Sequence, residues 1–272
     1  MIKNSPIKIC LAILCCLNLT APTAFAQLPV KASHPRIFLD ATTKTALLTK
    51  KNNKTTEWRL LLADANKYLP KQVIPWNEVT ASSNAYYSSG DIFYSYCGSN
   101  WEVAAMTIGL AHQLTKKNNA GANPTVYSAK LLQFADVIIK AYADYPPNSN
   151  YKPNIFQFNS AYATRHVGKT IAVIYDWCFD ELGDTRKAAL RNVMISWYKY
   201  MRATPYGLNQ LQTDPTGNYF VGHLVCAGYM GYAIGSDDPI SKKMIEFARQ
   251  RLTGAKGSIS RSSTSGESAK NY

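Results

Sequence analysis

Small apolar segments alternate with amphipathic segments along most of this chain. The small apolar segments cover residues 102–114, 165–179 and 218–234. Each precedes a segment whose apolar residues recur at helical spacing and whose Lys and Arg residues face the other way, at 127–142, 185–201 and 239–252. Because a helix that is apolar on every side must be buried, the pattern predicts three helical hairpins, each with an inner and an outer helix.

Two shorter helices are predicted before these hairpins. Asp40 is typical of an N-cap and should start a helix that ends near Lys50, and a second helix should cover 56–68. No stretch shows the alternation of apolar and polar residues expected of a strand, so we predict an all-α fold. The inner helices begin near 101, 165 and 218, a spacing too long for the familiar short helical repeats. It suits helical hairpins that curl into a ring.

The first 26 residues have the features of a secretory signal peptide. Lys3 and Lys8 precede an apolar run over 9–19, which is too short to span a membrane, and Ala24 to Ala26 provide the small residues of a cleavage site. We therefore expect residues 1–26 to be removed. Residues 27–272 should then act in the periplasm or outside the cell, with no membrane partner.

Removal of this leader would leave three cysteines, Cys97, Cys178 and Cys226, and so at most one disulfide within the chain. Their spacing is not that of a disulfide scaffold, and we expect none of structural importance. The cysteines and the four histidines never fall at zinc-finger spacing, and no acidic calcium loop or Gly-rich phosphate loop occurs. The sequence therefore predicts no metal site and no cofactor.

The balance of charge is strongly basic. With the two leader lysines removed from the 30 basic residues, 28 remain against 17 acidic residues, a net charge of +11. An acidic partner fits this charge, and nucleic acid, anionic lipid and anionic polysaccharide would all satisfy it. Secretion and the absence of nucleic-acid-binding motifs argue against nucleic acid. The alternative is that the positive charge only maintains solubility.

Polar residues at the start of the third inner helix are the first candidates for chemistry. Asn218 follows a turn-rich run and His223 lies five residues later, on a helix that has no charged residue before Asp237. A polar start on an apolar helix is typical of an active site. The alternative interpretation makes Asn218 an N-cap and His223 a satisfied core histidine.

Four short pieces of the chain resemble the heparinase II/III-like and alginate lyase-like polysaccharide lyases. They are HPRIFL at 34–39, IAVIYDW at 171–177 with LGDTR at 182–186, GNYFVGH at 217–223 and SGESAKNY at 265–272. The resemblance implies an (α/α) toroid over 27–272. It also implies that the toroid is incomplete, that the C-terminal β-sandwich of these lyases is absent, and that the chain is a truncated product and a poor catalyst.

The resemblance further implies β-elimination on a uronic-acid polysaccharide such as alginate or a glycosaminoglycan. In such a reaction a base removes the proton next to the carboxylate, whose charge must be neutralised, while the glycosidic oxygen leaves. Asn218 would polarise the carboxylate and His223 or His166 would act as base or as a further carboxylate contact. Tyr272 would correspond to the tyrosine that serves these lyases as base and acid. Arg165, His166 and Tyr219 are the expected substrate-binding residues.

Other interpretations of these residues stay open. Arg165 and His166 are equally explained as a helix-end pair that faces solvent. The chain could be a non-catalytic glycan-binding fragment of such a lyase, or an (α/α)-toroid glycoside hydrolase, which would need paired carboxylates. The plausible acids are few: Glu102, Asp176 and Glu267. We interpret Tyr175, Asp176 and Trp177 as packing residues and His112 as a structural histidine.

Overall fold

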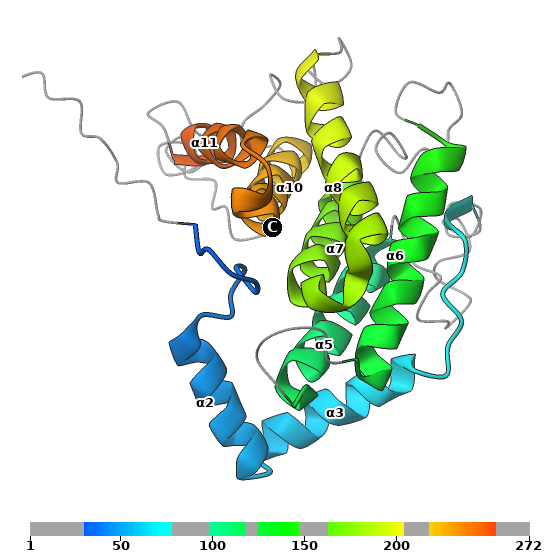
Figure 1. Ribbon diagram of the computed structural model, residues 1–272, viewed down its shortest axis with the longest axis vertical. Coiled ribbons are helices and arrows are strands. Elements are labelled where there is room, and N and C mark those ends of the chain that lie inside the picture. The colour runs from blue at the N-terminus through cyan, green and yellow to red at the C-terminus, as the bar shows by residue number, and fades with distance from the viewer. Residues whose placement is uncertain (1–29, 78–97, 118–123, 147–162, 204–217, 254–272) are drawn as a thin grey trace, which may run out of the picture. The chain divides into compact units, whose positions relative to one another are not determined.

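Helices make up the part of the chain that the structure describes. The computed structural model describes residues 30–77, 98–117, 124–146, 163–203 and 218–253. Within these ranges the regular elements are helices and no strand is present, which confirms the predicted all-α class. All of these helices belong to one compact unit, Lys31–Tyr272 (Figure 1). No described helix combines the length and the apolar character needed to cross a membrane.

The predicted elements are observed close to their expected bounds. The two early helices are α2 (Ala41–Asn52) and α3 (Thr56–Tyr68). The inner helices are α5 (Ser99–Thr115), α7 (Thr164–Trp177) and α10 (Asn218–Ile234). The outer helices are α6 (Val126–Asp144), α8 (Phe179–Ala203) and α11 (Ile240–Thr253), with a short 3₁₀ turn, η3 (Gly235–Asp237), before α11.

Local chemistry sets several of these boundaries. Asp40 accepts a hydrogen bond from the backbone N–H of Thr43 at 2.6 Å, so it is the N-cap of α2 as predicted. Gly183 interrupts α8 with a positive φ of 68°, which a residue with a side chain adopts only under strain. The helix predicted at 185–201 is therefore the part of α8 that follows this break.

The inner helices α5, α7 and α10 lie parallel, with α7 between the other two. Glu102 in the first turn of α5 contacts His166 in the first turn of α7, and Gln113 near the end of α5 contacts the carbonyl of Trp177 at the end of α7. Likewise Arg165 lies against the start of α10, and Tyr175 bonds Asp237 just beyond its end. The starts of all three helices therefore share one side of the bundle.

The outer helices pack against the inner ones in antiparallel pairs. The N-cap of α6, Thr125, contacts His112 near the end of α5, while Phe134 in the middle of α6 contacts Trp101 at the start of α5.

Small residues allow the inner helices to approach closely. A Cβ added to Gly109 would lie 2.8 Å from the Trp177 ring, and one added to Gly168 would lie 2.9 Å from Cys226 Sγ. This explains why the inner segments are rich in small apolar residues.

A buried polar network fastens the segment before α2 to the ends of α7 and α10. The Asp176 carboxylate accepts hydrogen bonds from the backbone N–H groups of Arg36 and Ile37 at 2.7–2.8 Å, and from His34 Nδ1 at 2.6 Å. Trp177 Nε1 donates to the carbonyl of Ile37. Asp176 and Trp177 therefore hold the chain at 34–37, which agrees with the prediction that they are packing residues.

Arg36 extends this network to the end of α10. Its guanidinium donates to the carbonyls of Ala233 and Ile234 and pairs with both carboxylate oxygens of Asp237. A cation is favourable there, because the last carbonyls of a helix carry partial negative charge. The bonds from His34, Arg36 and Tyr175 hold the pKa of Asp237 far below its ordinary value, although burial opposes the shift. The segment 34–36 therefore connects the C-terminal ends of the inner helices α7 and α10.

Candidate functional site

Among the described N-cap residues, those of α5 and α7 make no side-chain cap hydrogen bond. The N-cap positions are Gly98 and Ala163, which have no side-chain acceptor, whereas Asp40, Thr55 and Thr125 cap α2, α3 and α6. The first backbone N–H groups of a helix carry partial positive charge and need an acceptor. Uncapped parallel helix starts, placed side by side, are a favourable environment for an anion.

Basic side chains lie at this shared end of the helices. His166 Nδ1 contacts Glu102 Oε2 at 2.8 Å, and Lys169 forms an ion pair with Glu102 Oε1. Burial alone would raise the pKa of Glu102, but the bonds from His166 and Lys169 outweigh it and lower the pKa. Glu102 is therefore ionised at neutral pH. It orients two cationic or basic groups on consecutive turns of α7.

Arg165 and His223 form the second half of the cluster. Arg165 packs across Gly222, where an added Cβ would lie 2.9 Å from Arg165 Cβ, so α7 and α10 are in close contact at this point. His223 follows Gly222 and is only 1 % exposed. Burial, together with the nearby charge of Arg165, lowers the pKa of His223 to about 4. The imidazole is therefore neutral at pH 7.

His223 lies in a buried place between Arg165 and an aromatic ring. In the described part of the chain neither of its ring nitrogens makes a hydrogen bond, and the Trp197 ring lies beside it, with ring centroids 6.4 Å apart. A buried polar group without a partner costs free energy. His223 is thus a buried histidine rather than a residue on an open groove.

The sequence-predicted site residues are brought together only in part. Arg165 and His166 lie in the first turn of α7, and His223 lies in the second turn of the neighbouring helix α10. The helix α10 begins at Asn218, but the side chains of Asn218 and Tyr219 and the whole of Tyr272 fall outside the described residues.

Sequence reasoning missed the roles of Glu102 and Lys169. Lys169 follows Arg165 by four residues and His166 by three, so all three share one face of α7. The shared face of these three residues could therefore be predicted from their spacing. The pairing of Glu102 with this face could not be predicted, because 64 residues separate Glu102 from His166.

An apolar cavity of about 400 Å³ lies elsewhere, between the segment before α2 and the helices α10 and α11. Its lining is almost entirely apolar and includes Phe38, Leu224, Tyr229 and Tyr232. The charged group at its edge, the Arg36 guanidinium, is already bonded to the end of α10 and to Asp237. The cavity therefore offers packing surface rather than acid–base chemistry.

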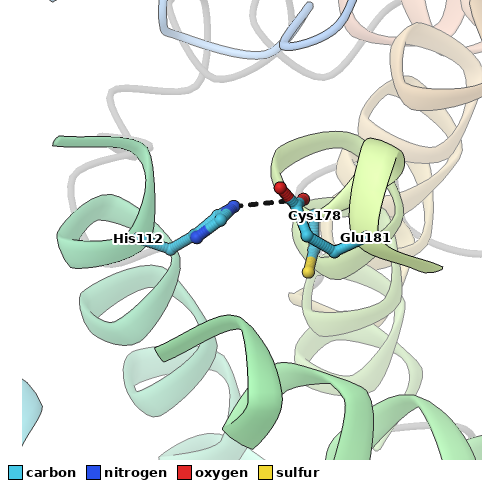
Figure 2. Close-up of side chains that lie close together, drawn as sticks. All are labelled: His112, Cys178 and Glu181. Atoms are coloured by element: carbon cyan, nitrogen blue, oxygen red, sulfur yellow. Dashed lines mark ion pairs between the residues drawn. The ribbon is translucent and has the colours of Figure 1, made fainter. Parts of the chain in front are cut away.

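One group of donors suited to a metal ion occurs in the described residues, far from the cluster at the helix starts. It consists of His112, Cys178 and Glu181 (Figure 2). Their ligand atoms all lie within 4.8 Å of one another. The other described cysteine, Cys226, donates from its thiol to the carbonyl of Thr164 at 3.0 Å, and both cysteines are free thiols.

Comparison of the chain with protein-family models, with curated proteins and with solved structures gives no match.

Proposed function

We propose that this protein is a secreted lyase that binds an acidic, uronic-acid-containing polysaccharide at the starts of α5, α7 and α10 and cleaves it by β-elimination. The observation that carries the proposal is the cluster of Arg165, His166 and Lys169 beside two helix starts that lack side-chain caps. A carboxylated sugar fits such a place for two reasons. Its charge is attracted by the partial charges of the helix starts, and Arg can bind a carboxylate with two parallel hydrogen bonds.

In the proposed reaction the substrate carboxylate is held by Arg165, with Asn218 as a further polar contact and Tyr219 beside it. A base removes the proton on the carbon next to the carboxylate, and the electron pair forms a carbon–carbon double bond. The glycosidic C–O bond then breaks, and the leaving oxygen takes up a proton from the catalytic acid. Neutralising the carboxylate stabilises the negative charge that develops during proton removal.

Of the two histidines expected to act as base, the geometry favours His166. Its Nδ1 is held by Glu102, so the Nε2 lone pair is directed away from that carboxylate, and its ring is not fully buried. An oriented imidazole with an acidic partner is the usual arrangement of a histidine base. His223 is a weaker base because its pKa is lowered to about 4. We assign it a packing role near the start of α10, and Tyr272 remains the proposed acid.

The proposal includes the (α/α) toroid. Three parallel inner helices, each followed by an antiparallel outer helix, are the hairpin units from which such a ring is built. The basic charge of the chain supports an anionic glycan as substrate.

A glycoside hydrolase is a poorer explanation of the same residues. Asp176 lies ten residues beyond His166 on α7, and so about 15 Å from the Glu102 end of the helix. The paired carboxylates of glycosidases lie about 5 to 9.5 Å apart. Asp176 also accepts bonds from three donors of the segment 34–37. Glu102 and Asp176 are therefore not such a pair.

The test is a product analysis on alginate, on a glycosaminoglycan and on a neutral glucan as control. The expected products are unsaturated uronides, seen as an increase in ultraviolet absorbance, from the acidic polymers alone. His166→Gln should lower kcat by about 100-fold or more while alginate still binds, because general base catalysis contributes about that factor. Saturated reducing ends would show hydrolysis instead. Binding of alginate without any cleavage would support the alternative, a glycan-binding module.

A further inference from the structure

A buried group of three donors joins the last turns of α5 to the start of α8. His112 comes from α5, Cys178 from the junction of α7 and α8, and Glu181 from the first turn of α8 (Figure 2). The His112 and Glu181 side chains are 0 % and 2 % exposed, and Cys178 is fully buried. His112 Nε2 lies 3.1 Å from Glu181 Oε2.

The other nitrogen of His112 is fixed by a neighbouring helix. Nδ1 lies 3.0 Å from the hydroxyl oxygen of Thr125, the residue that caps α6. When Nδ1–H donates to this hydroxyl, the lone pair of Nε2 points toward Glu181 and Cys178. In the described part of the chain the contact of the buried Nε2 is its 3.1 Å ion pair with Glu181, drawn in Figure 2, and it makes no hydrogen bond there. A proton or a metal cation between the nitrogen and the carboxylate stabilises such a contact.

We propose that His112, Cys178 and Glu181 bind a zinc ion or a similar divalent transition metal. The set of one sulfur, one nitrogen and one oxygen donor suits zinc, which prefers four tetrahedral ligands, and water would complete the set. At zinc–ligand distances of about 2.0 to 2.3 Å, tetrahedral ligands lie about 3.3 to 3.8 Å apart. The 3.1 Å His112–Glu181 contact is close to this range, and the 4.8 Å limit for all three requires only small side-chain shifts.

Metal binding would release one proton. The thiol of Cys178 releases one proton to solvent as the sulfur–metal bond forms, and the Glu181 carboxylate and the neutral His112 ring bind without further proton loss. Thr125 is the positioning residue that holds the His112 ring, an arrangement common around metal-bound histidines. Two further charges act on Cys178, those of Lys116 and Asp180, and they form an ion pair with each other at 3.6 Å.

The site would be structural and separate from the proposed carbohydrate site. His112 follows Glu102 by ten residues, about 15 Å along α5. The metal would tie α5 to α8 at the end of the bundle opposite the helix starts, and it would not contact substrate. Metal binding and lyase activity can therefore fail independently.

The experiment uses the secreted full chain, freed of metal with a chelator and titrated with Co²⁺. We expect one equivalent to bind with the near-ultraviolet absorption of a thiolate–cobalt bond, and Zn²⁺ to displace it and raise the melting temperature. The band should disappear in Cys178→Ser, and His112→Gln and Glu181→Gln should weaken binding by at least tenfold. Cys226→Ser is the matched control, because it removes the other described buried thiol and should leave the band unchanged.

Two results would overturn the proposal. One is the absence of a thiolate–cobalt band in the folded wild-type protein, with folding verified by circular dichroism. The other is loss of the band in Cys97→Ser or Cys226→Ser, which would place the metal on another thiol. If Cys178→Ser does not fold, the Cys97→Ser and Cys226→Ser variants still test the proposal. Residues 27–272 contain three cysteines, so a thiolate–cobalt band that persists in both of these variants assigns the ligand to Cys178.

Discussion

Removing the Asp176 carboxylate should strongly destabilise the fold. The side chain is 1 % exposed and lies at the end of α7. It is the common acceptor for His34 Nδ1 and for the backbone N–H groups of Arg36 and Ile37. The substitutions to compare are Asp176→Ala and Asp176→Asn.

The magnitude follows from the bonds that are lost. Asp176→Ala leaves two buried backbone N–H groups and one imidazole nitrogen without their acceptor, and each such group costs about 1 to 3 kcal/mol. Allowing for partial relaxation, we expect a loss of about 3 to 5 kcal/mol, the range observed when a buried charge pair is broken. Asp176→Asn keeps one acceptor oxygen and should lose about half as much. A typical domain has a stability of only about 5 to 15 kcal/mol, so the effect is large.

The assay is urea unfolding followed by far-ultraviolet circular dichroism. Asp184→Ala is the control, because Asp184 is fully exposed and its ion pair with Lys187 is long, at 3.8 Å. Its loss should change the stability by less than about 0.5 kcal/mol. A loss below about 1 kcal/mol in Asp176→Ala, or an equal loss in the control, would refute the assignment of Asp176 as the anchor of the segment 34–37.

Two further predictions concern the inner helices. Acid should destabilise the fold through His223, because burial lowers the pKa of its imidazole from 6.5 to about 4. The contribution of the neutral imidazole to the free energy of unfolding is complete above about pH 6.5 and is lost as the pH falls to about 4, a difference of about 3 kcal/mol. In His223→Leu the stability measured between these pH values should fall less steeply, and an unchanged slope would contradict the assignment. Gly109→Ala should cost about 1 to 3 kcal/mol in thermal unfolding, since the new Cβ would lie 2.8 Å from the Trp177 ring. Gly228→Ala, whose Cβ would meet Ala248 at an ordinary 3.7 Å, should instead be stabilising by up to about 1 kcal/mol, and equal effects of the two changes would refute this packing.

The helices and their order could be predicted from the sequence because they depend on local patterns. The predicted helix 56–68 has the observed bounds of α3, and the predicted helix at 218–234 has those of α10. The N-cap role of Asp40 was likewise predictable, because a cap contacts the backbone only three residues away. Spacing and capping are properties of neighbouring residues.

The partners of the polar side chains could not be predicted, because they lie far away in the sequence. Asp176 was predicted to help packing, but its bonds to residues 34–37 cross about 140 positions of the chain. The contact between His112 and Glu181 depends on the antiparallel return of α6 and on the junction of α7 and α8. Sequence spacing could not show that His112, Cys178 and Glu181 meet, because it considers only donors that are near in sequence, whereas these three meet through the packing of helices.

The most direct test of the central claim is the affinity of alginate for Arg165→Gln compared with Arg251→Gln. Both changes remove one positive charge, but Arg165 lies at the start of α7 whereas Arg251 is exposed on the outer helix α11. Isothermal titration calorimetry should show a loss of about 10- to 100-fold for Arg165→Gln, the value of one charge-assisted carboxylate contact. For Arg251→Gln the affinity should stay within about twofold of the wild type. Equal losses in the two variants, or no binding by the wild-type protein, would contradict an acidic-glycan site at the starts of the inner helices.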